Sequence, residues 1–340
     1  MNVKSCKASI HSLLKTDDKN FIRLLYVLIA VFLLCAIVKP ETFLQISNFQ
    51  SMAAIFPEFG ILSLGISLSL ISGGMDLSVV FIANLSAIIA AKFMLALAPD
   101  DSSPYTLLII IAAIMVSLLV GIICGLFNGF LIAKIKIPAM LATIGTQQMF
   151  WGLAIVLTGG SSLSGMPELY STVMNSTLFN FLPVSLLIFI ICATALSIFL
   201  SKTRYGSEIY LIGTNAKASK YAGINNDQLT ILTYVISGVF SALAGLVMMA
   251  GSNSCRADYG ESYTMQCVLI AVMGGVNPNG GFGNVKGIVT AIVILQFLSS
   301  TLNMFENISN FYRDVIWGAA LIIVLIVNYI INQRREAAAK

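Results

Sequence analysis

The sequence predicts an all-α polytopic protein that crosses a membrane about ten times. Hydrophobic residues make up 58% of the 340 residues and charged residues only 10%, whereas a soluble domain carries about 25% charged residues. The mean hydropathy of the chain is +0.91. Apolar runs of about 20 residues recur along most of the chain, and each is long enough to cross a hydrocarbon core of about 30 Å.

Ten apolar segments account for this pattern. They lie at approximately 22–39, 52–72, 75–97, 106–133, 138–158, 181–201, 229–250, 263–274, 285–304 and 312–331. The first is longer than the core of a signal peptide, so we expect a retained helix. The eighth is too short to span a membrane alone, which predicts a broken or half helix. The predicted organisation is a cytoplasmic tail over 1–20, a membrane domain over 21–332 and a second cytoplasmic tail over 333–340.

The positions of the basic residues predict that both termini lie in the cytoplasm. With the N-terminus inside, four of the nineteen basic residues fall outside, namely Lys39, Lys92, Arg256 and Arg313. The other fifteen fall inside, as the positive-inside rule requires. An eight-span arrangement with two re-entrant segments keeps the same ends, so this count does not exclude it.

Two glycine-rich breaks of the same style interrupt the apolar segments, at 72–78 and at 273–284. In each, a Gly-Gly pair is followed two residues later by Asp76 or Asn277, and we expect Asp76 to cap the helix that follows. Glycine interruptions at matching places in two halves typically mark a translocation path. Two tight turns without solute contact explain the pattern equally well.

Neutral polar residues within the apolar segments offer hydrogen bonds to a polar solute, or alternatively to neighbouring packed helices. The residues predicted to line a path are Gly73, Gly74, Asp76, Asn84, Asn128, Gln147, Gly274, Gly275 and Asn277.

A polar island at 202–227 separates two long apolar runs and carries four basic residues, which predicts a cytoplasmic loop. Asn215 is expected to cap a short helix over 216–222, and Gly223 to follow it in a left-handed conformation. Such a helix is a handle for a soluble partner, or else it merely connects two spans. The residues predicted to dock on the partner are Thr214, Asn215, Ala216, Lys217, Lys220, Tyr221 and Gly223.

The chain lacks the groups that many membrane enzymes and ion-coupled transporters use. Its single histidine, His11, lies in the N-terminal tail, no P-loop occurs, and the six cysteines show no paired spacing. Few acidic residues lie deep in the apolar segments, where each costs about 2.5–3.5 kcal/mol on insertion scales. We therefore predict no catalytic residue, metal site or cofactor in this chain.

Four motifs resemble the membrane permeases of ribose-type ATP-binding-cassette (ABC) sugar importers. The segment 74–80 (GMDLSVV) is similar to the family's Gly-Ile-Asp-Leu-Ser-Val-Gly signature, and 127–146 carries its Asn-Gly and Ile-Pro-Ala elements. The island at 203–225 resembles the family's ATPase-docking loop, and 272–287 resembles its later glycine-rich motif. The motifs follow the family's order over residues 60–310.

The resemblance implies a type II-like ABC importer permease that performs no chemistry itself. ATP and Mg would belong to cytoplasmic ABC ATPase subunits. The other implied partners are a second permease (a copy or a paralogue), an exported solute-binding protein and membrane lipid, without nucleic acid. The implied location is the bacterial plasma (inner) membrane. The solute is expected to be a monosaccharide or a similar small polar molecule. Val80 and Trp151 replace the family's usual Gly and Arg, so a furanosyl autoinducer or a nucleoside stays possible.

Two other classes of function stay open on the sequence. One is a stand-alone secondary transporter or facilitator of small polar solutes, against which the scarcity of intramembrane acids and the capped cytoplasmic helix both argue. The other is a membrane enzyme acting on lipid, which the absence of intramembrane histidine and of paired acids disfavours.

Overall fold

The computed structural model describes residues 19–98, 105–178, 182–305 and 315–319, together with residues 322 and 326. Within these residues, eight helices are long and apolar enough to cross a membrane, which confirms the predicted all-α polytopic class. They are α2 (Lys19–Val38), α4 (Ile46–Ile71), α5 (Val79–Leu97), α6 (Thr106–Ala133), α7 (Ala139–Thr158), α9 (Val184–Lys202), α12 (Asn226–Ser252) and α14 (Val285–Asn303).

Shorter elements connect these helices. They are α3 (Pro40–Phe43), α8 (Glu168–Asn175), α10 (Arg204–Thr214), α11 (Ala216–Tyr221), α13 (Tyr263–Met273), β1 (Leu163–Ser164), β2 (Thr177–Leu178), β3 (Leu182–Pro183) and β4 (Ser254–Cys255). The eighth predicted segment is indeed short, since α13 has only 11 residues. Most of the predicted tails and of the tenth segment, 312–331, lie outside the described residues.

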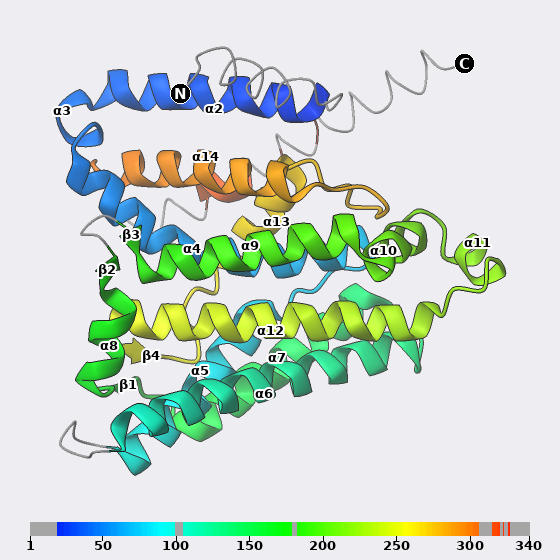
Figure 1. The fold of residues 1–340 in the computed structure, drawn as a ribbon, viewed down its shortest axis with the longest axis horizontal. Helices are drawn as coiled ribbons and strands as arrows, with labels where there is room; N and C mark the ends of the chain where they lie inside the picture. The colour runs from blue at the N-terminus through cyan, green and yellow to red at the C-terminus, as the bar shows by residue number, and fades with distance from the viewer. Residues whose placement is uncertain are drawn as a thin grey trace, which may run out of the picture.

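Helices α4, α5 and α12 form the centre of the bundle. In the most apolar window of each, 83%, 72% and 67% of residues are buried, against 6% for α2. Helix α12 packs on α4, α5 and α6, while α2 lies along one edge, beyond α14 (Figure 1). The peripheral helix α2 therefore presents most of its apolar surface to the membrane.

Glycines allow α12 to approach its neighbours closely. A side chain at Gly125 of α6 would overlap the backbone carbonyl of Tyr234, and one at Gly245 of α12 would overlap that of Ala83. Backbone-to-backbone approach through small residues is typical of membrane helix pairs. Gly125 and Gly245 belong to the small-residue motifs Gly121-x-x-x-Gly125 and Ser241-x-x-x-Gly245, which therefore mark the close contacts of α12.

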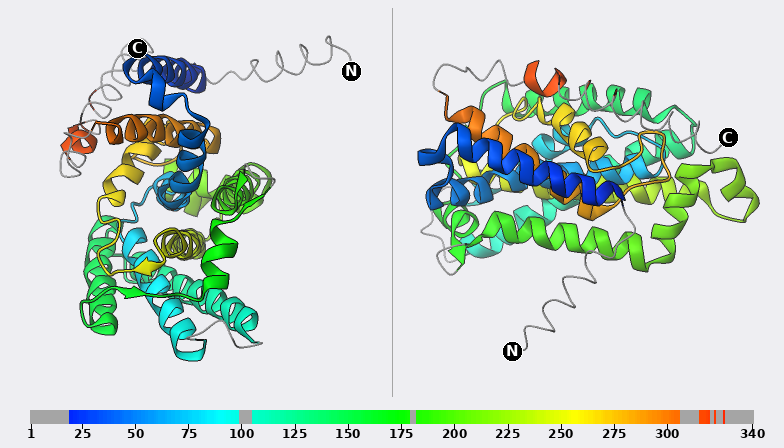
Figure 2. Two further views of the ribbon diagram at one scale, coloured as in Figure 1. Left: turned by 90° about the vertical axis from the view of Figure 1, so that its left-hand side faces the viewer. Right: turned by 90° about the horizontal axis from the view of Figure 1, so that it is seen from above.

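The connecting elements gather at the two ends of the bundle. Strand β1 pairs with β4 and β2 with β3, both antiparallel, and these strands lie with α8 at one end (Figure 1). Helices α10 and α11 extend beyond the other end, and the right-hand view of Figure 2 shows the same arrangement. The polar 202–227 loop is therefore well separated from the strands.

Both predicted breaks are present, between α4 and α5 and between α13 and α14. The expectation that Asp76 caps α5 is wrong, because the residue at the cap position is Ser78 and it makes no side-chain cap bond. Instead the backbone N–H of Ser78 donates to Asp76 Oδ1 at 3.1 Å. The carboxylate therefore closes a turn before the helix starts and is directed sideways, towards α12.

Candidate functional site

The 202–227 loop folds into two capped helices. The Thr203 side chain accepts from the Gly206 N–H and begins α10. Asn215 Oδ1 accepts from the N–H groups of Lys217 and Ala218, both at 3.0 Å, and begins α11. Gly223 has φ +81° just after that helix. The predictions for Asn215 and Gly223 are confirmed, although α11 ends at Tyr221, one residue earlier than expected.

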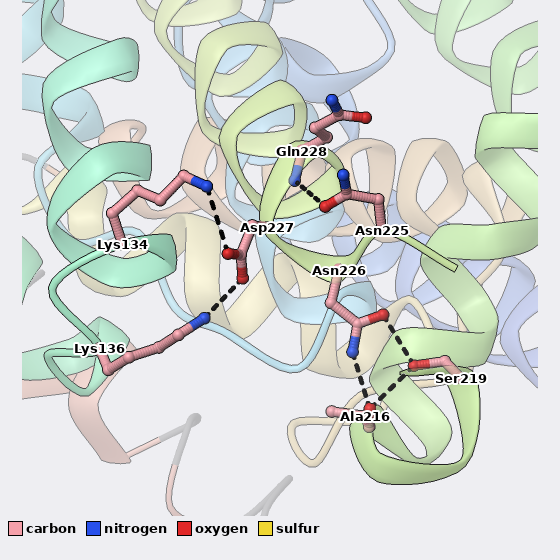
Figure 3. Close-up of polar contacts among 8 residues, drawn as sticks. All are labelled: Lys134, Lys136, Ala216, Ser219, Asn225, Asn226, Asp227 and Gln228. Carbon is pink, nitrogen blue, oxygen red and sulfur yellow. Dashed lines mark hydrogen bonds and ion pairs between the residues drawn. The ribbon is translucent and has the colours of Figure 1, made fainter. Parts of the chain in front are cut away.

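Helix α11 is tied to the first turn of α12 by one asparagine (Figure 3). The Asn226 amide donates to the carbonyl of Ala216 at 2.7 Å, and its Oδ1 accepts from the Ser219 hydroxyl at 2.9 Å. Ser219 is the one buried side chain of α11. Helix α11 has only six residues and would not be stable as an isolated helix. These hydrogen bonds therefore hold it in one orientation.

The outward surface of this loop is fully available to a partner. Tyr221 is 93% exposed. The seven residues predicted to dock on a partner are all exposed: Thr214, Asn215, Ala216, Lys217, Lys220, Tyr221 and Gly223. Their docking role stays a prediction.

A second loop is attached beside it. Asp227, in the first turn of α12, forms ion pairs with Lys134 at 3.4 Å and with Lys136 at 2.5 Å (Figure 3). Lys136 adopts φ +67°, which is uncommon for a residue with a side chain. The lysines are exposed, so the pairs are individually weak. They nevertheless hold the α6–α7 connection against the same turn of α12 that holds α11.

Burial also affects the ionisation of groups near the two ends. Burial raises the pKa of the Tyr210 phenol in α10, and it raises the pKa of the Cys255 thiol in β4 to about 12. The Glu208 carboxylate, 2.6 Å from the Arg204 guanidinium, raises the pKa of that arginine. All three groups therefore keep their protons at neutral pH.

Three of the predicted path residues belong to buried hydrogen-bond networks. Asp76 accepts from the hydroxyls of Ser78 at 2.7 Å and Ser237 at 2.8 Å, and the Asn128 amide donates to the Ser78 hydroxyl at 2.8 Å. Elsewhere the Asn84 amide donates to two backbone carbonyls of the α12–α13 connection. The structure brings Asp76 and Asn128 together and gives each of the three side chains a protein partner, although Asn128 Oδ1 accepts no hydrogen bond from the described residues.

The predicted glycines and Asn277 lie in close packing and turns. Gly74 has no room for a side chain beside the Tyr234 hydroxyl, and Gly274 has none beside α14. Gly73 and Gly275 have φ +84° and +88°. Asn277 Oδ1 accepts from the backbone N–H of Asn279 at 3.1 Å, which closes the second break. The breaks are therefore built as rigid turns.

A polar cavity of about 690 Å³ lies between α7, the first break, α13 and residues 317–318. Among the described residues that line it, Gln147 is the only one predicted to line a path. The other polar members were not predicted from the sequence: Asp258, Glu261, Ser262, Thr264 and Trp317. Three of these, Asp258, Glu261 and Ser262, fall in a polar run directly before the shortest apolar segment, and that position was a signal that could have identified them.

Two buried polar atoms at this cavity have no hydrogen-bond partner in the described part of the chain, Thr264 Oγ1 and Trp317 Nε1. Their residues are only 7% and 4% exposed. An unpaired buried donor or acceptor costs about 1–3 kcal/mol, so such groups are normally satisfied by a ligand, water or further protein. Residues Thr264 and Trp317 thus line the cavity together with an amide and two carboxylates, while their own polar atoms are covered in this structure.

Comparisons with known proteins agree with the motifs. Residues 48–325 match the family described as branched-chain amino acid transport system / permease component. The autoinducer 2 import system permease protein LsrD of Photorhabdus luminescens is 33% identical over 273 residues, which cover 78% of each chain. LsrD of Photorhabdus temperata is 31% identical over 315 residues, which cover 91% of each chain.

A solved structure titled as an inward-facing conformation of a putative metal-chelate type ABC transporter has the same fold. Its TM-score is 0.51 over 91% of this chain and 98% of that one, at 16% sequence identity. The family match covers more than half of the described bundle, both breaks and the 202–227 loop. This chain belongs to the branched-chain amino acid transport system / permease component family.

Proposed function

We propose that this chain is the membrane permease subunit of an ATP-driven importer for a small, hydroxyl-rich solute of the autoinducer 2 or monosaccharide type. The permease role rests on the family match and on relatives that are permeases of autoinducer 2 import systems. The solute class rests on one observation, a cavity whose lining carries an amide, hydroxyls and two carboxylates.

The chemistry of the cavity suits a neutral polyol. Amide and hydroxyl groups such as Gln147 and Ser262 both donate and accept hydrogen bonds. Glu261 accepts from solute hydroxyls and repels anions, whereas the charge of Asp258 is offset by Arg256 at 2.7 Å. The Trp317 ring supplies a flat apolar face for the C–H side of a small ring. In such a site, several hydrogen bonds of moderate strength fix the orientation of the bound solute.

The remaining partners follow from this role. Hydrolysis of ATP, with its Mg, takes place on separate cytoplasmic ATPase subunits that dock on α11, and an exported protein delivers the solute. Two permeases, alike or paralogous, enclose the path. The chain lies in the bacterial inner membrane with both ends in the cytoplasm. The described residues contribute positioning and solute contacts rather than catalysis.

Reconstitution tests this proposal directly. The permease is placed in proteoliposomes with its cognate ATPase and exported binding protein, and uptake of labelled ribose and of autoinducer 2 is measured with and without ATP. We expect uptake of at least one of them that requires ATP and the ATPase. Equal uptake by the permease alone, without ATP, would instead establish a stand-alone facilitator.

A further inference from the structure

Three segments that are distant in sequence meet at the base of the 202–227 loop. They are the end of α4 with the first break, the last residues of α10, and the second break. The backbone N–H of Gly281 in the second break donates to the carbonyl of Ile71 at the end of α4, at 2.9 Å. Gly213 of α10 packs against both partners of this bond.

The contact is made by backbone atoms. A side chain at Gly213 would overlap the carbonyl of Ile71 and the N–H of Gly281. A Cβ at Gly280 would lie 2.7 Å from Gly213 O and 2.7 Å from Gly73 Cα. We call Gly73, Gly213, Gly280 and Gly281 the glycine junction. Because backbone atoms cannot rotate aside as side chains do, the junction has little means of absorbing a displacement.

Two side chains of α10 reinforce the junction. The Tyr210 hydroxyl donates to the carbonyl of Gly283 at 2.8 Å. Thr214 packs on Gly281, where an added Cβ would lie 2.9 Å from Thr214 Cα. Thr214 is also the only residue between Gly213 and Asn215, the cap of α11. The cap residue of α11 thus lies two residues from Gly213 of the junction.

Each break leads from the junction to the wall of the cavity. Leu77 of the first break lines the cavity, and so do Thr264 and Met265 of α13, the helix that precedes the second break. The first break is also attached to α12 through Asp76 and Ser237. The two breaks that meet at the junction are therefore continuous in the chain with both cavity walls.

We propose that the glycine junction transmits displacement of α11 to the two breaks, so that its glycines are positioning residues for coupled transport. This inference rests on the proposed function, in which α11 contacts the ATPase. Packed elements with two discrete arrangements respond as units to small shifts, and direct backbone contact makes α10 and both breaks one unit.

A matched set of variants tests the junction in the reconstituted complex. Gly213→Ala introduces a methyl group where backbone leaves no space, whereas Gly152→Ala introduces the same group where nothing lies within 4 Å. Tyr210→Phe removes one hydrogen bond without adding volume. For Gly213→Ala we expect normal recovery of the ATPase and retained basal hydrolysis, with solute stimulation and uptake reduced about 5- to 150-fold. Gly152→Ala should match the wild type, and Tyr210→Phe should fall between.

A spectroscopic measurement separates transmission from a merely structural role. Spin labels at the exposed positions Ala218, which is outside the predicted docking residues, and Phe282 report the separation of α11 from the second break. We expect that separation to stay constant between the nucleotide-free and the ATP-trapped complex, because the junction moves as one body. A separation that changes while uptake continues, or wild-type coupling in Gly213→Ala, would overturn the inference. Failure of the wild type to show ATP-dependent uptake would count against the proposed function instead. In that case the distribution of distances between the labels in the isolated permease still tests the junction. We expect it to be narrow in the wild type and broader in Gly213→Ala.

Discussion

At the scale of single residues, Asp76 shows how a buried carboxylate serves as a structural pin. It is fully buried and accepts from one backbone N–H and two hydroxyls, on the first break and on α12. Such a network is stable only while every member is satisfied. Removing one partner leaves the others unpaired in a place that water does not reach.

Substitutions at Asp76 distinguish this role from direct action on the solute. Asp76→Ala should lower the free energy of unfolding by about 1–3 kcal/mol, since two hydroxyls lose their acceptor. Asp76→Asn keeps one oxygen and should be milder, because the Ser237 hydroxyl can turn and accept from the new amide. Thermal unfolding of purified permease and uptake are measured together. Equal and severe loss of uptake in both variants at normal membrane levels would show that the negative charge itself acts on solute or partner.

Trp317 permits a similarly sharp test of the cavity. Trp317→Phe keeps an aromatic face but removes the indole N–H, and Trp317→Ala removes both. If the N–H holds a solute hydroxyl, Trp317→Phe should raise the KM for uptake about tenfold, which corresponds to about 1.4 kcal/mol, and Trp317→Ala should raise it further. The Trp151→Phe variant, altered at an exposed residue of α7 that does not line this cavity, serves as control. An unchanged KM in Trp317→Phe would remove the indole from solute recognition.

Some of these residues could be predicted from their neighbours in sequence, whereas others depend on contacts between distant parts of the chain. Asn215 and Gly223 follow from capping and from left-handed geometry, which depend only on neighbours in sequence. Thr264 and Trp317 could not be identified from the sequence, because only the folded chain brings α13 and residue 317 to the same cavity. The assignment of Asp76 as a helix cap was wrong for the same reason, since its partner Ser237 lies 161 positions away.

At the scale of elements, side-chain hydrogen bonds to the backbone fix the conformation of the 202–227 loop. Asn215 caps α11 from within, and Asn226 secures it from α12. The lengths of the spans and the positions of both breaks were predictable from hydropathy and glycine content. The contact between the breaks was not, because sequence spacing does not say which turn meets which.

The end of α11 gives an element-scale prediction. Gly223 has φ +81°, a conformation that costs a β-branched residue about 1–3 kcal/mol. Gly223→Val should therefore displace α11 and reduce co-purification of the ATPase, and Ala216→Glu should do so by placing a charge on its outward surface. Gly223→Asn is the matched control, since asparagine tolerates this conformation. Wild-type recovery of the ATPase with both Gly223→Val and Ala216→Glu would reject this loop as the docking site.

At the scale of the whole molecule, the connecting elements lie at the two ends of an apolar helical bundle. The capped loop and the ion pairs of Asp227 lie at one end, and the strands with α8 at the other (Figure 1). The sequence predicted this division from the distribution of basic residues, a property of the entire chain. The described residues give the two ends their structure, while their assignment to the cytoplasm and the exterior remains a prediction.

Labelling of single cysteines settles that assignment. Tyr221→Cys places a thiol on a position that is 93% exposed, at the loop end. Ser162→Cys places one on an exposed position next to β1, at the strand end. Ser219, although in the loop, is unsuitable because it is 4% exposed. With an impermeant maleimide on intact cells, we expect position 162 to react and position 221 to be protected until the membrane is opened.

We expect the described native cysteines not to react with the maleimide, so the labelling reports only the introduced thiols and decides the orientation. The five described ones are all buried, and burial raises the pKa of Cys255, the one nearest the labelled strand end, to about 12. Its thiol therefore carries almost no thiolate at pH 7.5, the form that attacks maleimide. Only Cys6, outside the described residues, needs replacement by serine. Reaction at position 221 in intact cells with protection at 162 would invert the molecule, moving α11 away from ATP and contradicting both the docking role and the proposed direction of import.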